Sequence, residues 1–402
     1  MNDKRLQMYR KYQGFIRHVL IISGCWYMPT KSGKPRYYWS LCVLLVAITY
    51  ALLNMHASYF HRHRLAIMMK YIGITISAFG VILKVGSVLI NRSSLIHCYQ
   101  TLKDLFEEEL TQNDQVRAII FSPLPTIRIL AYIYSAILIA MMMAFFMPAY
   151  LSVIRDLCHL HLTTNYSLPI SRGYGYFWTV PNNFLYHFHL LFETSGAAVS
   201  SITACSMDSA FGFYVYQFAS TMRAMTFRLT NPQPNEKFSN VLRTCVAKHQ
   251  KLLLCRNTLE HVYGPIVFWH TVTNAVLLCA LIYEMSSLSE INIFSVSISL
   301  TYGMIKCLQT FTYAWYGTIL TDAGEDFRKG IYFGEWHNSR LDRHVRTNVI
   351  LIMMQKPMTI NAFFSSVDMI MFTNVSTSIY MKVLFYLNWI ISNIITLSLH
   401  NL

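Results

Sequence analysis

The sequence predicts an all-α membrane protein with seven transmembrane helices, a cytoplasmic N-terminus, an extracellular C-terminus and a cytoplasmic helical anchor. Three observations predict this fold class. Of the 402 residues, 54% are hydrophobic and only 13% are charged, which is too apolar for a soluble protein of two or three domains. Seven apolar stretches reach the roughly twenty residues that a spanning helix needs. Lys and Arg are also distributed very unevenly between the segments that connect these stretches.

The fourth expected span is the least regular of the seven, because Glu193 and Asp208 lie within it. Carboxylates inside a span are functional by default, although these two can also face a watery cavity or satisfy a neighbouring helix. In chain order, the expected spans are residues 37–57, 66–90, 128–152, 187–218, 263–286, 291–317 and 364–390.

The distribution of basic residues predicts the orientation. With the N-terminus inside, 24 Lys and Arg residues fall on the cytoplasmic side and four on the other, namely Arg62, Arg64, Arg155 and Arg172. Cytoplasmic segments carry the excess of Lys and Arg, so the N-terminus is expected in the cytoplasm. The net charge of +14 is then mainly a consequence of topology, and we expect no nucleic-acid partner.

The connecting segments divide the chain into seven parts. Gln355, Lys356 and Pro357 interrupt an apolar stretch and are interpreted as the boundary between a cytoplasmic helix and the last membrane helix. The parts are a cytoplasmic N-terminal segment at 1–36, spans one to four at 37–218 with an extracellular loop at 153–186, an anchor helix region at 219–262, spans five and six at 263–317, a second anchor helix region at 318–357, the last membrane helix at 358–390 and an extracellular tail at 391–402.

Two features of the extracellular side agree with this topology. Asn165 begins an Asn-Tyr-Ser glycosylation acceptor in the loop expected outside. Of the nine cysteines, only Cys158 lies in an extracellular segment, so no intrachain disulfide is expected there.

Enzymatic and metal-binding signatures are scarce. The chain has no Gly-rich phosphate loop, no His-Glu-x-x-His and no Cys-x-x-Cys. Its paired histidines lack a Cys or carboxylate that would complete a ligand set. We therefore expect neither an enzyme nor a bound cofactor or metal.

Several motifs in one order carry a resemblance to a known family. They are "HQKLLLCRNTLEHVYG", "QTFTYAWYGTIL", "YFGEW" and "ILIMMQKPMTI…SSVDMIMFTNVSTSIYMKVLFYL". With the predicted topology, this segment from about 242 to 390 resembles the insect odorant receptors, which are seven-span ligand-gated cation channels. The chain lacks the long second intracellular loop of the family's shared co-receptor, since "TNPQPNEKF" is short.

The resemblance therefore implies an odour-binding tuning subunit that assembles with the co-receptor, as a tetramer, in the plasma membrane of olfactory sensory neurons. Its implied partners are membrane lipid, permeant cations and a small volatile hydrophobic ligand.

The same resemblance implies a pore along the last helix. Val383 takes the gate position in "YMKVLFYL", and an apolar ring at this position stops ions by dewetting. Lys382 beside the gate and the extension from Asn388 to Leu402 depart from the family pattern. The implied pore-lining residues are Ser376, Ile379, Val383 and Leu387.

The odour site of the family lies in the outer half of the bundle, among spans two, three, four and six. A Met or an aromatic residue in a span more often serves packing than ligand contact, so only the resemblance selects these positions. The matching positions are Tyr71, Ile74, Met142, Phe145, Phe146, Phe192, Gly196, Phe294, Ile298 and Thr301, with Tyr71 and Thr301 as possible polar contacts.

Two alternatives stay open at this point. A gustatory receptor of the same superfamily usually ends in Thr-Tyr, five residues and Gln-Phe, and this chain has "SIYMKVLFYLN" there instead. A transporter or a metabotropic receptor is the other alternative. A transporter is expected to show internal repeats and broken helices, and the sequence shows neither.

Overall fold

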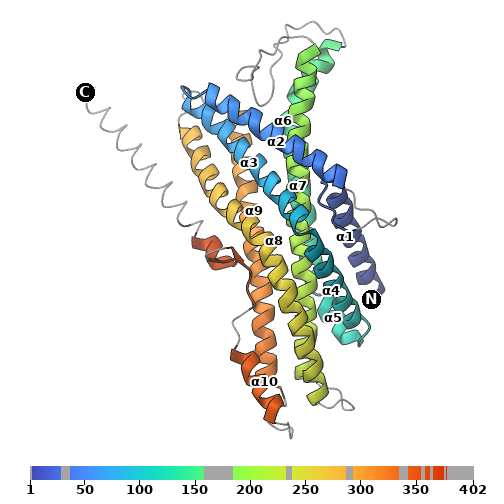
Figure 1. Ribbon diagram of the computed structural model, residues 1–402. Helices are drawn as coiled ribbons and strands as arrows, with labels where there is room; N and C mark the ends of the chain where they lie inside the picture. The colour runs from blue at the N-terminus through green and yellow to red at the C-terminus, as the bar shows by residue number, and fades with distance from the viewer. Residues whose placement is uncertain are drawn as a thin grey trace, which may run out of the picture.

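A computed structural model describes residues 2–28, 37–157, 184–231, 238–286, 293–334, 343–354, 358–362, 365–374 and 377. Over these residues the chain is almost entirely helical, and the helices form an elongated bundle (Figure 1). The helices are α1 (Asn2–Ile22), α2 (Tyr37–Phe60), α3 (Leu65–Ile90), α4 (Arg92–Leu110), α5 (Asp114–Phe121), α6 (Leu124–Leu157), α7 (Phe184–Thr230), α8 (Phe238–Ser286), α9 (Ile293–Tyr332) and α10 (Arg343–Met354).

Six of these helices correspond in position to the first six expected spans. Within the described residues, three segments are long and apolar enough to cross a membrane, namely Tyr37–Phe60, Ile67–Ile90 and Asp114–Arg155. Helices α7, α8 and α9 contain the fourth to sixth expected spans but are 47, 49 and 40 residues long. At 1.5 Å per residue they extend well beyond a bilayer. The expected spans and the expected anchor regions are therefore parts of the same continuous helices.

The N-terminal segment is a helix packed into the bundle. The buried side chains of α1 recur at intervals of three and four residues, as one helix face requires, and they are Tyr9, Tyr12, Ile16 and Leu20. After α1 the chain turns at Gly24, whose φ of 72° favours glycine.

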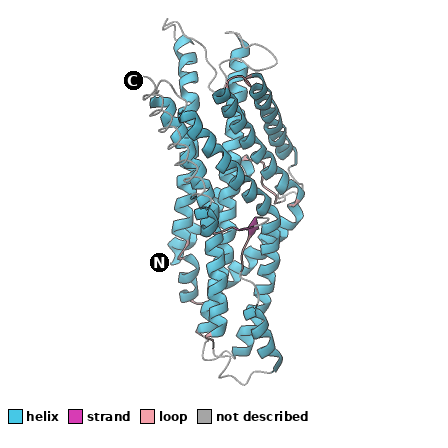
Figure 2. Ribbon diagram, turned by 90° about the vertical axis from the view of Figure 1, so that its left-hand side faces the viewer, coloured by secondary structure: helices cyan, strands magenta, loops and turns pink. Residues whose placement is uncertain are grey.

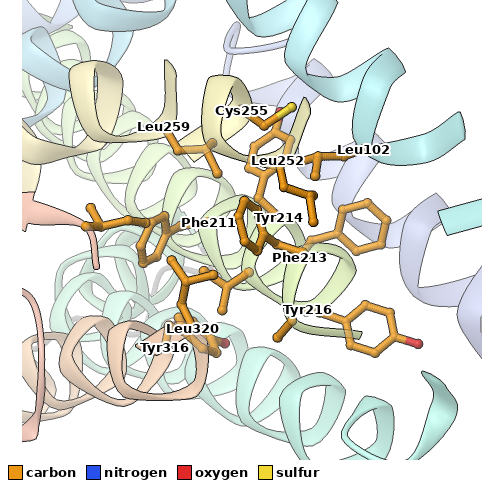
Figure 3. Close-up of a cluster of buried hydrophobic side chains, with 14 of the residues drawn as sticks. Leu102, Phe211, Phe213, Tyr214, Tyr216, Leu252, Cys255, Leu259, Tyr316 and Leu320 are labelled. Carbon is orange, nitrogen blue, oxygen red and sulfur yellow. The ribbon is translucent and has the colours of Figure 1, made fainter. Parts of the chain in front are cut away.

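The main hydrophobic core surrounds the middle of α7. Helices α1, α4, α5, α6, α8 and α9 all contact α7, so its residues from about 207 to 229 are buried on nearly every side. A helix enclosed in this way has no solvent-facing side, so its polar residues Asp208, Gln217 and Thr221 are buried as well. The rings of Phe211 and Tyr263 lie 4.8 Å apart, and those of Phe211 and Tyr313 lie 5.2 Å apart. Figure 3 shows this core, in which Leu102, Leu252 and Leu320 come from three other helices.

The start of the last expected helix differs from the sequence prediction of a helix over 358–390. Strand β1 (Asn361–Ala362) pairs with β2 (Ser365–Ser366) as an antiparallel hairpin, and helical backbone begins only at Met369 (Figure 2). The side chain of Asp368 stabilises this later start, because its Oδ1 accepts a hydrogen bond from the Met371 N–H at 2.8 Å. Most of the expected last span, and Gln355 to Pro357, lie outside the described residues.

Candidate functional site

A second hydrophobic cluster, separate from the main core, is formed by α2, α3, α6 and α7. We call it the aromatic cluster. Six of the ten residues expected at the odour site belong to it: Tyr71, Ile74, Met142, Phe145, Phe146 and Phe192. Its other buried members are Tyr50, Ala51, Ala57, Ala78, Ala149, Tyr186 and Leu190. Residues far apart in the sequence are thus brought together in one apolar group.

Aromatic rings determine the geometry of this cluster. The rings of Phe145 and Phe146 meet edge-on at 5.6 Å. The rings of Tyr50 and Phe192 lie 6.3 Å apart. Such contacts add to the stabilisation from area burial, because ring edges and faces carry opposite partial charges. The aromatic cluster can bind an apolar molecule through dispersion and shape complementarity. It contains few side chains that could catalyse a reaction.

Gly196 contributes to the aromatic cluster by close approach. A Cβ atom at Gly196 would lie 2.5 Å from the ring of Tyr50. Only a glycine therefore lets the α2 ring rest on the α7 backbone. Gly196 therefore borders the aromatic cluster through its contact with Tyr50, one of the cluster's buried rings.

The remaining expected odour-site residues come from α9, and of these only the side chain of Thr301 is described. Thr301 is exposed on α9, and the side chains of Phe294 and Ile298 lie outside the described residues. Tyr71, the other expected polar contact, is 2% exposed, and its ring stacks on His61 at 5.3 Å.

Asp208 is the centre of a buried polar group that joins four helices. Its carboxylate receives hydrogen bonds from Lys84 Nζ at 2.6 Å on α3 and from the Tyr134 hydroxyl at 2.9 Å on α6. On α9, Gln309 Nε2 donates at 2.8 Å and the Tyr313 hydroxyl at 2.5 Å. Burying an ion pair is costly unless its hydrogen bonds are satisfied, and here four donors satisfy the carboxylate.

The sequence singled out Asp208 but not its partners. Lys84 lies in the second expected span, and an intramembrane cation is a signal that it has a partner. Glu193, the other carboxylate in the fourth expected span, is buried on α7 one residue beyond Phe192 of the aromatic cluster.

A second ionic group, which the sequence did not predict, lies where α4 packs against α8. Glu109 on α4 is fully buried and pairs with Lys248 on α8, which also contacts Glu108 at 3.0 Å. The sequence signal for this pair is the run of three glutamates from Glu107 to Glu109, together with the basic segment that contains Lys248. Next to Lys248, His249 stacks on Phe327 at 5.0 Å, and burial lowers the pKa of its imidazole to about 4.

The hairpin that precedes the last helix lies against α8 and α9 at three glycines. A Cβ atom at Gly317 would lie 1.7 Å from the main-chain oxygen of Val367. Gly264 approaches β1 and Gly324 approaches Met358 in the same way. The Thr318 hydroxyl also accepts a hydrogen bond from the N–H of Met369, where the last helix begins.

The expected pore and glycosylation residues belong to the part of the chain that the structure does not describe. Ser376, Ile379, Val383, Leu387 and Asn165 all lie outside the described residues. Among the residues that are described, no group of three or more His, Cys, Asp or Glu side chains has the arrangement of a metal site.

Two solved structures share the helical fold of this chain. In a search of solved structures, the olfactory receptor OR5 from Machilis hrabei in complex with eugenol matches with a TM-score of 0.77 at 14% identity, over 96% of this chain and 99% of that one. The same receptor, in the structure described without eugenol, matches with a TM-score of 0.75 at 15% identity, over 94% and 98%.

Sequence comparison gives a partial relative and a family. The odorant receptor coreceptor of Anopheles gambiae is 21% identical over 137 residues, which is 34% of this chain and only 28% of the coreceptor. The sequence profile described as "7tm Odorant receptor" matches residues 64–380. Because that match covers most of the chain, the protein belongs to the 7tm odorant receptor family.

Proposed function

We propose that this odorant receptor is the odour-binding subunit of a heteromeric odour-gated cation channel, with the aromatic cluster as its ligand site. The observation that carries the proposal is the convergence of residues from α3, α6 and α7 in that cluster. The matching Machilis hrabei receptor was solved in complex with eugenol, which supports a small-molecule site in a bundle of this fold.

The composition of the aromatic cluster favours volatile apolar ligands. Met142 adapts its flexible side chain to irregular shapes, and Phe145 and Phe192 offer flat apolar surfaces. A ligand of about ten heavy atoms gains roughly 5–8 kcal/mol in such a wall, which corresponds to micromolar to sub-millimolar affinity.

Assembly with a co-receptor and conduction along the last helix complete the proposal. The local similarity to the Anopheles gambiae coreceptor and the short segment from Thr230 to Phe238 support a tuning subunit that pairs with a co-receptor. In this proposal the N-terminus is cytoplasmic, the channel lies in the plasma membrane of sensory neurons, and Val383 forms the gate. Glycosylation of Asn165 in the extracellular loop belongs to the same proposal.

The direct test is a panel of volatiles applied to cells that express the chain with and without the co-receptor. We expect agonist-evoked cation currents only when both chains are present. Robust currents from this chain alone would contradict its assignment as a tuning subunit. A co-expressed chain that reaches the surface and responds to no volatile in a broad panel would contradict odour gating.

Site-directed changes separate the ligand site from the pore. Phe145→Ala or Phe192→Ala removes apolar contacts worth roughly 1–3 kcal/mol, so half-maximal concentrations of some odours should rise about tenfold. Ion selectivity should stay unchanged. Phe188→Ala is the matched control, because Phe188 is an α7 aromatic that is 61% exposed. Val383→Ala should instead alter basal leak or ion selectivity while the ranking of odours stays the same.

Concentration–response curves and bi-ionic reversal potentials on the same cells provide the two readouts. The co-receptor residue that matches the gate should be changed in parallel, because the other subunits also line the pore. Changes in the aromatic cluster that move the reversal potential and preserve the odour ranking would contradict the proposed ligand site.

A further inference from the structure

Helix α2 carries exposed aromatic side chains at both ends. Tyr38 at its start is 86% exposed and Tyr59 near its end is 67% exposed. Tyrosine and tryptophan are enriched at the two surfaces of a membrane, where lipid tails give way to water. From residue 38 to residue 59 the helix rises by about 32 Å, close to the roughly 30 Å of a hydrocarbon core. The start of α2 therefore corresponds to one membrane surface.

Helices α1 and α4 both reach the start of α2. Trp39 Nε1 donates a hydrogen bond to the Ile22 carbonyl at 2.8 Å, so the end of α1 lies beside the start of α2 (Figure 1). From the start of α4, the guanidinium of Arg92 lies over the ring of Tyr37, with its Cζ 4.6 Å from the ring centre. The same membrane surface is thus lined by three helix ends.

A second arginine belongs to this group of contacts. The Cζ of Arg17 lies 5.5 Å from the ring centre of Trp26, and the Trp26 ring stacks on Tyr27 at 5.8 Å. The Tyr27 carbonyl accepts a hydrogen bond from Arg92 Nε at 2.8 Å. The two arginines are therefore connected through one short segment between α1 and α2. We call Arg17 and Arg92 the boundary arginines.

The boundary arginines have N–H groups to spare for an anion. Arg17 is exposed and Arg92 is partly exposed, and the hydrogen bond to Tyr27 occupies only the Nε of Arg92. Within the described residues, neither guanidinium lies within ion-pairing distance of a carboxylate. Two turns before Arg17, Arg10 and Lys11 are also exposed and add positive charge.

We propose that the boundary arginines bind the phosphate group of an anionic phospholipid in the adjacent membrane leaflet. A guanidinium matches phosphate oxygens with parallel N–H groups, and it does so while stacked on an aromatic ring. The positive-inside rule accounts for basic residues on this side of the membrane. It does not account for two arginines that are held on aromatic rings without a counter-ion.

The charge of the site selects the class of lipid. Two guanidinium groups repel the ammonium group of phosphatidylcholine, whereas the net negative headgroup of phosphatidylserine has no such penalty. With the predicted orientation, the adjacent leaflet is the cytoplasmic one, which carries the anionic lipids of a cell membrane. The inference goes beyond the proposed function, because it uses neither the aromatic cluster nor the gate.

The test is photolabelling of the full-length chain in phosphatidylcholine nanodiscs that contain a trace of phosphatidylserine with a diazirine at the start of one acyl chain. Phosphatidylcholine with the same diazirine is the reference probe, and mass spectrometry identifies the labelled peptides. We expect the serine lipid to label the segments that carry Arg17, Trp26 and Tyr37 at least about fivefold more than the choline lipid, since one basic residue near a membrane surface contributes about this factor. Unlabelled phosphatidylserine should displace the label, and inorganic phosphate should not.

A matched pair of arginine variants tests the residues. Arg17→Gln should lower the preference for the serine lipid about fivefold, and its exposed position lets the protein fold. Arg62→Gln is the control, because Arg62 is exposed and lies over Tyr59 at 4.8 Å at the other end of α2. It removes the same charge from the same kind of contact and should leave labelling at the start of α2 unchanged.

Three results would overturn the proposal. Equal labelling by the two probes would show that the boundary arginines do not select an anionic lipid. Equal labelling of Arg17→Gln and Arg62→Gln would show that Arg17 does not hold the headgroup. Displacement by inorganic phosphate would assign the site to a soluble anion instead of a lipid.

The readout is independent of the proposed function. Both leaflets of the nanodisc have the same composition, so the labelling does not depend on the predicted orientation, and no odour-evoked current is measured. The lipid site can therefore be refuted while the proposed function stands, and the reverse also holds.

Discussion

Removal of Lys84 tests whether the polar group around Asp208 holds the bundle together. Both side chains of the pair are almost fully buried, at 1% and 3% exposure. Lys84→Met keeps the side-chain length and leaves the carboxylate with three neutral donors. Breaking a buried pair by removing one partner costs roughly 3–5 kcal/mol, because an uncompensated charge remains.

A second change in the same group should reverse part of this loss. Asp208→Asn, combined with Lys84→Met, removes the stranded charge and keeps an oxygen that accepts from Tyr134, Gln309 or Tyr313. We expect the double variant to recover about half of the lost stability, since neutral hydrogen bonds contribute less than charged ones. The two positions are in direct contact, so their effects should be strongly non-additive.

The assay is the apparent melting midpoint of the purified protein in detergent at a fixed heating rate. Lys84→Met should lower the midpoint by roughly 5 °C or more. Lys103→Met is the matched control, because Lys103 pairs with Glu107 at 3.7 Å and both are largely exposed. Exposed pairs contribute less than about 1 kcal/mol. The reasoning fails if Lys84→Met melts with the control, or if the double variant is no more stable than the single one.

Three further predictions concern the hairpin, the buried imidazole of His249 and the topology. Gly317→Ala should lower the free energy of unfolding by about 1–3 kcal/mol, because the added methyl group pushes the Val367 carbonyl away. Gly86→Ala is the matched control, because an added Cβ at Gly86 has no neighbour within 4 Å, and equal melting midpoints of the two variants would contradict this prediction. Burial lowers the folded pKa of His249 from 6.5 to about 4, so its stabilising contribution is full above pH 6.5 and is lost as the pH falls toward 4. That loss amounts to about 2 kcal/mol between pH 7 and 5, and His249→Phe, stacked on Phe327, should flatten this pH dependence of the melting midpoint. A tag at the N-terminus should require permeabilisation for antibody labelling and a tag at the C-terminus should not; surface labelling of the N-terminal tag would refute the predicted orientation.

Hydrophobic length was enough to predict the three most apolar helices. The first three expected spans correspond to the apolar helices of the structure. The N-terminal helix was missed although its signal is present, since Tyr9, Tyr12, Ile16 and Leu20 repeat at helical spacing. The basic residues between them were interpreted as a sign of topology, and the helical spacing of the apolar residues was not used.

The hairpin could not be predicted from local pattern, because its cause is tertiary. The sequence from Met358 to Ser366 is apolar enough to continue into a spanning helix. Its extended form matches three close approaches by glycines of α8 and α9, which no periodicity within the segment reveals. The six residues of the aromatic cluster were selected through a family resemblance, since single aromatic residues in a span do not distinguish a ligand site from packing.

Helix α9 connects these features physically. Gln309 and Tyr313 bind Asp208, whose other partners lie on α3 and α6, the helices that also carry the aromatic cluster. One turn further along α9, Gly317 and Thr318 contact the chain at the point where the last helix starts. Because the backbone of Gly317 lies against the Val367 carbonyl and Thr318 binds the Met369 N–H, we expect a displacement of α9 to be transmitted to the hairpin and to the beginning of the last helix. A ligand that binds more tightly to one position of α9 would therefore favour one position of the last helix. Ligand gating requires such a difference in affinity between two states of the protein.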